Sequence, residues 1–331
     1  MKIAYVICVN YCISHFNGIR MQANEWADEL QKQGCTVVRV NPWDNVAWET
    51  FDIVHIFGQV DFLYNFCRRI TDRNKNIVLS PIIDTVYKRW AYKLVSHIGS
   101  KFMRLYSVNY QVRISSRYIK LFLARTQHEY SYIHNSYSVP DEKIKIVPLS
   151  FRLPKIENVR KEDFCLHVSK ITDKRKNVLR LCLAAEKFGF KLILAGSISS
   201  EEDFRAIKEV IDKNENISYV GRLSDADLLD YYCRAKVFAL PSINEGVGLV
   251  ALEAAVNGCE IVVTELGGPK EYYGEGAYTV NPYDINDIGE KIMQALYHGK
   301  GQPQLSKTIS EKFNLQHCVY QLREAYKSIL S

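Results

Sequence analysis

The chain has no long apolar run. No segment reaches the roughly 18 consecutive apolar residues that a membrane-spanning helix needs, so no integral membrane protein is predicted. The first residues, MKIAYVICVNYCISHFNG, place one lysine before an apolar run, as a secretory signal peptide does. No small-residue cleavage site follows, and polar residues return by Asn10. Residues 3–9 are therefore predicted to form a buried first strand.

Cysteine occurs without a disulfide or metal-binding pattern. The nine cysteines are an odd number, and no two of them form a CxxC pair or another metal-ligand spacing. Most lie in apolar runs, where a thiol behaves as a small hydrophobic group. We therefore expect a reducing, cytoplasmic location. The cysteines are Cys8, Cys12, Cys35, Cys67, Cys165, Cys182, Cys233, Cys259 and Cys318.

Acidic residues are missing from one stretch of the first half. Between Asp84 and Glu129 there is no Asp or Glu, whereas nine Lys and Arg residues fall there. Because the net charge of the whole chain is only +6, the remainder of the chain is net negative. The positive charges of the stretch are Lys88, Arg89, Lys93, Lys101, Arg104, Arg113, Arg117, Lys120 and Arg125.

The length and the order of apolar runs predict two α/β domains. At 331 residues, the chain exceeds the usual size of one hydrophobic core. Both halves alternate β-rich and helical patterns, such as KIAYVICV, NEWADELQKQG and TVVRV, then FCLHVS, KNVLRLCLAAEKFG and KLILAG. This order predicts parallel strands with crossover helices, hence two Rossmann-like domains. Ligands bind beyond the carboxyl ends of such strands, so the site is expected in a cleft between facing domains.

The domain boundaries follow from composition. Segment 148–161 is polar, carries two prolines and is the predicted linker. We assign residues 1–154 to an acceptor-binding domain and residues 155–305 to a nucleotide-binding domain. A last helix, residues 306–331, has no strand after it and is expected to cross back to the first domain.

The segment SINEGVGLVALEA has the pattern of a phosphate-binding loop. Pro241 and Ser242 end a buried strand, Gly246 and Gly248 permit a tight turn, and helical spacing then continues up to Gly258. Such a loop aims backbone N–H groups and the positive end of a helix dipole at one point. This geometry suits a diphosphate.

Two glutamates accompany this turn. Glu245 lies in the loop and Glu253 in the following helix, eight residues further on. Ionised carboxylates accept the hydrogen bonds that sugar and ribose hydroxyls donate. Taken alone, Glu245 is best interpreted as a solvated loop residue and Glu253 as a partly exposed helix residue. The combination of strand, serine, glutamate, Gly-x-Gly and second glutamate favours a functional site.

This pattern, in the setting PSINEGVGLVALEAAVNGCEIVVTELGGPKEY, resembles glycosyltransferase family 4, a retaining family with the GT-B fold. The resemblance covers the second half, through VNPYDINDIGEKIMQAL, and less closely the first half. It implies two Rossmann-like domains facing across a cleft. It also implies that Glu245 contacts the donor sugar near the reacting carbon and that Glu253 contacts the nucleotide ribose. The backbone contacts to the phosphates are implied for Gly246, Val247, Gly248 and Leu249.

A pair of lysines extends the resemblance. In the family, an arginine and a lysine six residues later hold the donor diphosphate. In HVSKITDKRKNV, Lys170 stands at the arginine position and Lys176 follows six residues on. Two cations would neutralise the leaving group, although a lysine lacks the bidentate fork of arginine. The alternative is a solvated basic turn. The predicted nucleotide-sugar site is completed by Ser169, Gly196 and Arg222.

Other positions depart from the family pattern. The first strand-to-helix loop has one glycine, Gly18, where the family often has two, and we assign Gly18 a turn role near the phosphates. Asp84 replaces a histidine and either takes its catalytic place or simply ends a strand. Residues 225–227 form a DxD sequence that could hold a metal, but a helical run follows, so Ser224 or Asp225 is predicted to cap that helix. No metal and no cofactor are expected. The histidines predicted to be structural are His15, His55, His128 and His167.

These features predict a retaining, metal-independent glycosyltransferase. It would move a sugar from a nucleotide-diphosphate sugar to a glycan or lipid-linked acceptor in cell-surface polysaccharide synthesis, lipopolysaccharide included. A non-catalytic nucleotide-sugar-binding partner of a glycosyltransferase complex is the alternative.

The segment without Asp or Glu, residues 85–128, indicates a cellular location for such an enzyme. Residues 85–128 also hold Trp90, Phe102 and Met103, and cations mixed with apolar groups suit an anionic lipid surface. We therefore expect a peripheral location on the cytoplasmic face of the membrane. A solvated basic face, or a site for an acidic soluble acceptor, stays open. No nucleic-acid-binding module accompanies the charge.

Overall fold

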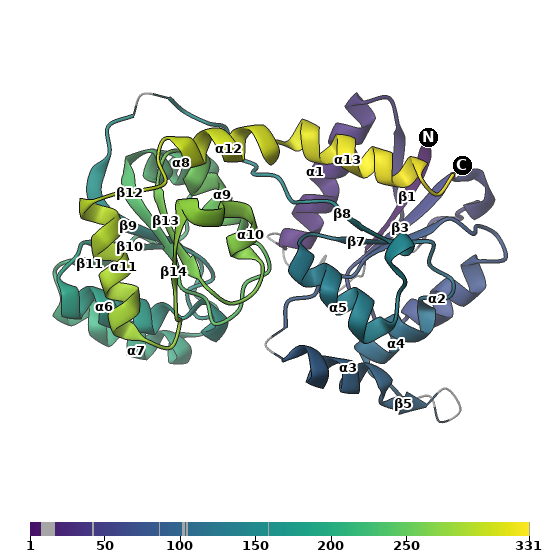
Figure 1. Ribbon diagram of the computed structural model, residues 1–331, viewed down its shortest axis with the longest axis horizontal. Helices are drawn as coiled ribbons and strands as arrows, with labels where there is room; N and C mark the ends of the chain where they lie inside the picture. The colour runs from purple at the N-terminus through teal and green to yellow at the C-terminus, as the bar shows by residue number, and fades with distance from the viewer. Residues whose placement is uncertain are drawn as a thin grey trace. The chain divides into compact units, whose positions relative to one another are not determined.

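The computed structural model describes residues 1–7, 17–41, 43–85, 87–100, 103, 105–157 and 159–330 (Figure 1). The chain forms two compact units. The first comprises Met1–Leu149 and Leu315–Ser331, and the second comprises Ser150–Asn314. The predicted first boundary, after residue 154, lies in the same polar linker as the division after Leu149. The predicted second boundary, before residue 306, precedes the division after Asn314.

A six-stranded parallel sheet is the centre of the first unit, in the order β2-β1-β3-β4-β7-β8. Strands β3, β4 and β7 are buried along their whole length, as parallel strands covered by helices on both faces are. Of the predicted first strand, residues 8 and 9 lie outside the described residues. The strands are β1 (Lys2–Ile7), β2 (Thr36–Arg39), β3 (Ile53–Phe57), β4 (Ile77–Ser80), β7 (Leu121–Ala124) and β8 (Ile144–Ile146).

Helices cover this sheet, and a two-stranded antiparallel ribbon projects from them. The helices are α1 (Gly18–Lys32), α2 (Leu63–Ile70), α3 (Arg89–His97), α4 (Val108–Ser115), α5 (Gln127–Tyr137) and α13 (Leu315–Lys327). The ribbon consists of β5 (Gly99–Ser100) and β6 (Leu105–Tyr106).

Helix α13, at the end of the chain, packs beside α1 in the first unit (Figure 1). Its Tyr326 hydroxyl lies 2.6 Å from His55 Nδ1 and 3.1 Å from the Tyr5 hydroxyl. All three side chains are buried, so the last helix is joined to the core strands β1 and β3 by a polar network.

The prediction of one continuous helix over residues 306–331 is wrong. Helix α12 (Gln304–Lys312) belongs to the second unit and ends before α13 begins. The Asn314 side-chain amide donates to the carbonyls of Ser310 and Glu311, which satisfies acceptors at the end of α12. The Phe313 ring packs on Tyr272 with 4.6 Å between centroids. The break between α12 and α13 therefore coincides with one local contact, that of Asn314, and one long-range contact, that of Phe313.

The second unit has its own six-stranded parallel sheet, in the order β11-β10-β9-β12-β13-β14. The strands are β9 (Glu162–Val168), β10 (Leu192–Ala195), β11 (Ile217–Tyr219), β12 (Ala235–Leu240), β13 (Glu260–Thr264) and β14 (Ala277–Val280). The helices are α6 (Val178–Phe188), α7 (Glu201–Lys213), α8 (Asp225–Arg234), α9 (Leu249–Val256), α10 (Pro269–Tyr273), α11 (Ile285–Tyr297) and α12.

The strand order of the second unit indicates a candidate binding site. Its six strands follow the doubly wound order 3-2-1-4-5-6. The order reverses between β9 and β12, which are hydrogen-bonded neighbours. Loops leaving the carboxyl ends of two such strands diverge and open a crevice at the switch point. The loops after β9 and β12 are therefore the structural candidates for a binding site.

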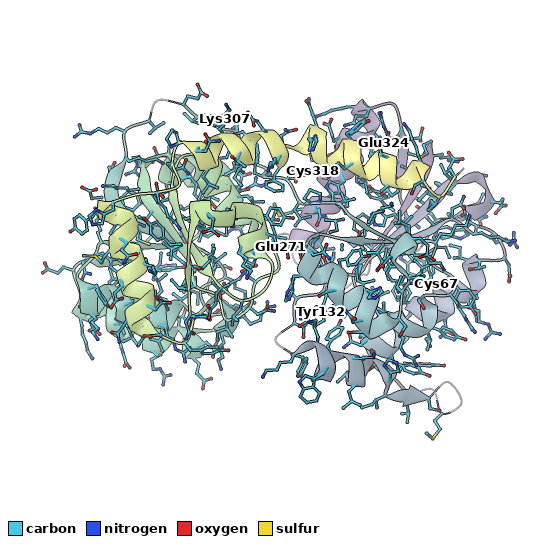
Figure 2. All side chains as sticks on the ribbon, in the orientation of Figure 1. Cys67, Tyr132, Glu271, Lys307, Cys318 and Glu324 are labelled. Atoms are coloured by element: carbon cyan, nitrogen blue, oxygen red, sulfur yellow. The ribbon has the colours of Figure 1, made fainter. Side chains whose placement is uncertain are left out.

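Six of the seven cysteines in the described residues are buried, in line with the prediction that most act as apolar side chains. Cys67 on α2 and Cys318 on α13, both labelled in Figure 2, are buried, and burial raises the pKa of each thiol to about 12. Seven cysteines fall in the described residues, and all seven are free thiols. At neutral pH, Cys67 and Cys318 act as small apolar side chains.

Candidate functional site

The loops after β9 and β12 meet through an ion pair. Lys176 Nζ lies 2.7 Å from Glu245 Oε2, and the Ser242 hydroxyl donates to the same oxygen at 3.1 Å. The Lys176 and Glu245 side chains are only 22% and 13% exposed. No described residue donates to Glu245 Oε1, so this oxygen can accept a hydrogen bond from a ligand. The structure thus brings two of the predicted catalytic residues into direct contact.

Buried hydrogen bonds fix the two loops to each other. The Asn177 side chain donates to the carbonyls of Pro241 and Pro282, at 2.9 and 2.6 Å. The Ile243 N–H donates to the Arg175 carbonyl at 2.8 Å. Asn177 is buried and has a left-handed backbone conformation, which ends the short helix Lys174–Lys176. Lys176 is consequently held at the Glu245 carboxylate rather than free in solvent.

The glycine turn leads directly into α9. Gly248 has φ 75° and ψ 61°, a left-handed conformation that favours glycine. A Cβ atom at this position would lie 3.0 Å from Leu240 Cδ2. The first N–H groups of a helix have no acceptor within the helix, so those after Gly248 can bind an anion. The phosphate contacts predicted for Gly246, Val247, Gly248 and Leu249 stay a prediction.

The Glu245 backbone is held from the other side by the loop after β13. The Gly268 N–H donates to the Glu245 carbonyl at 3.2 Å. Gly267 has φ 89°, and a Cβ there would lie 2.2 Å from the same carbonyl oxygen. Only glycine therefore permits this approach, and the position of Glu245 depends on three loops.

Tyr273 lies near both glutamates. Its buried hydroxyl donates to the Gly248 carbonyl at 3.3 Å. Burial raises the pKa of Tyr273 well above 10, and the negative charges of Glu245 and Glu253 add to this shift. The Tyr273 hydroxyl is therefore neutral at physiological pH and can donate its hydrogen bond to Gly248.

Glu253 is buried in α9 and has partners within the second unit. The Tyr232 hydroxyl donates to Glu253 Oε2 at 3.3 Å, and Arg152 Nε lies 3.5 Å from Oε1. Arg152 also pairs with Asp225. The ribose contact that the resemblance implies for Glu253 stays a prediction.

The remaining predicted residues of the second unit lie at the ends of β9, β10 and β11. Lys170 is exposed, and no described side chain pairs with it. The Ser169 hydroxyl lies 2.7 Å from His167 Nε2. Gly196 has φ 142°, and a Cβ there would lie 1.7 Å from the Ser169 carbonyl oxygen, so the close approach of these loops requires glycine. Arg222 lies in the turn after β11 and is exposed.

The first unit places its predicted residues differently. Asp84 lies four residues beyond the end of β4, so it does not end the strand. It accepts a hydrogen bond from Arg125 at 2.8 Å, and Arg125 also pairs with Glu129. Gly18 is the first residue of α1, where a Cβ atom would meet nothing within 4 Å, and Asn17 supplies the helix cap. The role near the phosphates that was predicted for Gly18 stays a prediction.

Several residues that build the site were missed at the sequence level. Asn177 and Tyr273 position Lys176 and the glycine turn, and Arg152 and Tyr232 hold Glu253. The one available signal was the asparagine that directly follows Lys176, because asparagine tolerates the left-handed conformation. The other three contacts depend on long-range packing.

The DxD sequence is a helix start, as predicted. The Ser224 hydroxyl caps α8 by accepting from the Asp227 N–H at 3.2 Å. In the described part of the chain, no three His, Cys, Asp or Glu side chains cluster as metal ligands would. Among the described residues, no helix is both long and apolar enough to cross a bilayer.

Comparisons with known proteins identify relatives of the second unit. Residues 151–312, nearly all of the second unit, match the family model described as glycosyl transferases group 1. The O-antigen chain mannosyltransferase B of Escherichia coli is 26% identical over 178 residues, which are 50% of this chain and 46% of that protein. The chain thus spans about half the length of this curated relative.

Solved structures resemble the whole chain. Sucrose-phosphate synthase from Thermosynechococcus elongatus has a TM-score of 0.75 at 15% identity, covering 99% of this chain and 98% of the other. HepE of Anabaena, solved in complex with UDP, has a TM-score of 0.73 at 13% identity, covering 99% and 100%. The chain therefore has the GT-B fold, as predicted, and its second unit matches a glycosyltransferase family.

Proposed function

We propose that this chain is a glycosyltransferase that moves a sugar from a nucleotide-diphosphate sugar to a glycan acceptor in cell-surface polysaccharide synthesis. The observation that carries the proposal is the contact of Lys176 with Glu245 at the switch point of the second sheet. The family match of residues 151–312 supports the reaction class. The similarity to an O-antigen mannosyltransferase supports the polysaccharide context.

The donor diphosphate is assigned to the cations and backbone N–H groups at the carboxyl ends of β9 and β12. We assign Lys176, Lys170 and the start of α9 to the stabilisation of the negative charge that the leaving group gains. Fixed positive groups in a partly buried site stabilise such charge without reorganising. Because two lysines serve this purpose, the proposed reaction needs no metal ion.

Glu245 is assigned to the donor sugar. Its Oε2 atom is taken by Lys176 and Ser242, whereas Oε1 remains for a sugar hydroxyl. We assign retention of the anomeric configuration, with the acceptor oxygen attacking the face from which the nucleotide leaves. The family resemblance is the ground for this assignment.

Donor binding and turnover test the proposal separately. A panel of nucleotide sugars should include one that raises the melting temperature of the chain, because a ligand that binds the folded state stabilises it. With that donor, adding a glycan acceptor should release free nucleotide. Proton NMR of the product should show the donor's anomeric configuration. Stabilisation without release under any acceptor would instead favour a non-catalytic nucleotide-sugar-binding partner.

A membrane-facing surface forms part of the proposal. Trp90, Leu94 and Ile98 follow one another at intervals of four residues along α3 and its end, and they are 70%, 57% and 61% exposed. Residues four apart share one helix face. Lys88, Arg89 and Lys93 are exposed beside this stripe. An apolar stripe between cations is typical of a helix that lies in the interface of an anionic bilayer. Phe102, from the same predicted segment, lies outside the described residues.

Vesicle flotation tests this surface. Replacing Trp90 and Leu94 with serine should weaken binding to anionic vesicles by at least about 100-fold, because each buried apolar side chain contributes about 1.5–3 kcal/mol. The matched control replaces the exposed Tyr297 of the second unit with serine and should leave recovery unchanged. Equal recovery of the wild-type chain with anionic and neutral vesicles would contradict the membrane assignment.

A further inference from the structure

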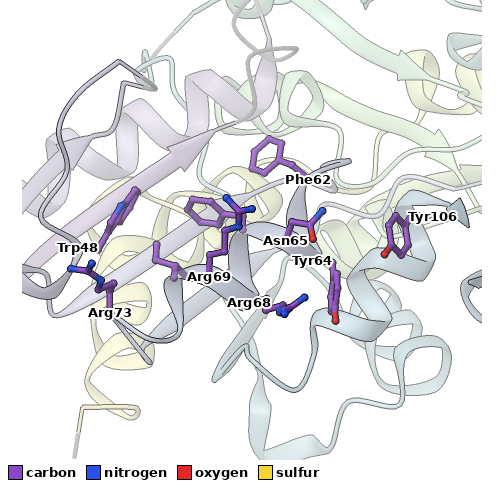
Figure 3. Close-up of a pocket in the computed structure, with 10 residues that line it drawn as sticks. Trp48, Phe62, Tyr64, Asn65, Arg68, Arg69, Arg73 and Tyr106 are labelled. Atoms are coloured by element: carbon purple, nitrogen blue, oxygen red, sulfur yellow. The ribbon is translucent and has the colours of Figure 1, made fainter. Parts of the chain in front are cut away.

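A groove runs along α2 in the first unit (Figure 3). None of the residues assigned to the donor site lines it. Its volume of about 890 Å³ is in the range of small-molecule sites. The residues that line it are Trp48, Phe62, Tyr64, Asn65, Phe66, Arg68, Arg69, Ile70, Arg73 and Tyr106. Three are arginines, five are aromatic and none carries a carboxylate.

The arginines are available to an anion. Arg68, Arg69 and Arg73 are exposed, and within the described residues none of them forms an ion pair. Arg68 and Arg69 lie in the last turn of α2, where positive charge also stabilises the helix dipole. Arg73 lies beyond the helix, so the dipole does not account for the whole cluster. Asp61 and Asp72 flank α2 but do not line the groove.

Packed aromatic rings form the rest of the groove. Trp48 and Phe62 both contact Phe66 edge to face, with centroids 5.6 and 5.9 Å apart. The Tyr64 hydroxyl accepts a hydrogen bond from Arg117 at 3.1 Å. Figure 3 shows Arg68 and Arg69 between Trp48 at one end and Tyr106 at the other. The cations therefore project from a surface whose rings pack against one another.

The Tyr106 end of the groove adjoins exposed apolar residues. The Tyr64 and Tyr106 rings are 6.2 Å apart, so Tyr106 closes the groove next to α2. Tyr106 belongs to β6, and its neighbour Leu105 is 58% exposed. Met103, in the turn of the same ribbon, is 64% exposed. The ribbon follows α3 directly in the chain, so a short segment joins the α3 stripe to the Tyr106 end of the groove.

We propose that the α2 groove binds the phosphate head group of an anionic membrane lipid, while Leu105, Met103 and the α3 stripe contact the apolar part of the bilayer. Arginine forks match phosphate oxygens. An acidic soluble glycan would use the arginines but would leave the apolar residues exposed, so the lipid accounts for both features. The inference rests on the membrane placement in the proposed function.

Binding to vesicles of phosphatidylglycerol tests the inference. The triple variant Arg68→Gln, Arg69→Gln, Arg73→Gln should bind them on the order of 100-fold more weakly, since each cation at an anionic surface contributes about a factor of five. Binding to phosphatidylcholine vesicles should stay unchanged. The charge-matched control is Arg205→Gln, Lys208→Gln, Lys213→Gln on the exposed side of α7, which should keep binding to phosphatidylglycerol within about threefold of wild type.

Two outcomes would overturn the inference. Equal losses in the two triple variants would mean that overall charge, and not the groove, attracts the lipid. If inorganic pyrophosphate stabilised the wild type but not the groove variant, while both bound phosphatidylglycerol equally, the groove would take a soluble phosphate instead. Thermal stabilisation by the donor sugar should be the same in all these proteins. That measurement confirms folding and separates a failure of this inference from a failure of the donor site.

Discussion

Two groups of positive charges, one in each unit, are held in opposite ways. In the second unit, Lys176 is mostly buried, bonded to Glu245 and fixed by a buried asparagine. In the first unit, the cations of α2 and α3 are exposed and lie among exposed apolar side chains. A fixed cation suits one small ligand in one orientation, whereas spread cations suit an extended surface. The comparison separates the proposed site for chemistry from the proposed surface for attachment.

Replacing Glu245 tests the chemical side of this comparison most strongly. Glu245→Gln should lower the rate of nucleotide release by about 1000-fold, because it removes the charge that faces the sugar and balances Lys176. Initial rates at saturating donor measure the effect. Glu275→Gln, which changes an exposed glutamate of the same unit, should retain the wild-type rate. Full turnover by Glu245→Gln would refute the assignment of the site.

Two glycines, Gly196 after β10 and Gly18 at the start of α1, should respond differently to alanine. Gly196→Ala should lower the free energy of unfolding by about 3 kcal/mol, because a Cβ would lie 1.7 Å from the Ser169 carbonyl oxygen. Gly18→Ala should change it by less than about 0.5 kcal/mol or raise it, since a helix position favours alanine. Thermal or urea unfolding of both variants checks this. Equal stability losses would show that the backbone is equally constrained at Gly18 and at Gly196.

Fixed and solvated lysines should also differ. Lys176→Gln should reduce nucleotide release by about 100-fold, because the leaving group loses a positioned cation. Lys170→Gln should cost only about tenfold, since an exposed ammonium is already well screened by water. Lys174, which is 88% exposed in the same turn, provides the control. A larger loss for Lys170 than for Lys176 would reverse the assigned roles.

The fold and the donor loop could be predicted because their signals are local. Buried parallel strands such as β3 and β4 have short continuous apolar runs, and the turn from Ser242 to α9 has glycines where the chain needs them. The start of α8 was also predictable, since Ser224 precedes an acidic first turn. Each of these features is set by residues close together in sequence.

The parts that could not be predicted depend on distant residues. The helix break after Lys312 depends on Phe313 packing on Tyr272, and no glycine or proline marks it. Glu253 resembles an ordinary helix glutamate until Arg152 and Tyr232 are placed beside it. The sequence also does not reveal that Asp84 meets Arg125, because 41 residues separate them. Such contacts come from tertiary packing rather than from local pattern.

A buried histidine in each unit should make stability depend on pH. Burial lowers the pKa of His55 to about 3 and that of His167 to about 4. Below pH 6.5 the unfolded chain binds protons that the folded chain does not, so the free energy of unfolding falls as pH decreases toward 4. Between pH 7 and pH 5.5 each histidine should account for about 1 kcal/mol.

Unfolding measured at several pH values checks this smallest effect and assigns it to a unit. His167→Asn should flatten the pH dependence of the second unit, and His55→Asn that of the first, because asparagine does not titrate. His298→Asn, at an exposed position, should leave the slope unchanged. If the two buried-site variants kept the wild-type slope, other groups would carry the acid sensitivity. Unequal slopes for His55→Asn and His167→Asn would identify the histidine that contributes more to the pH dependence of the free energy of unfolding.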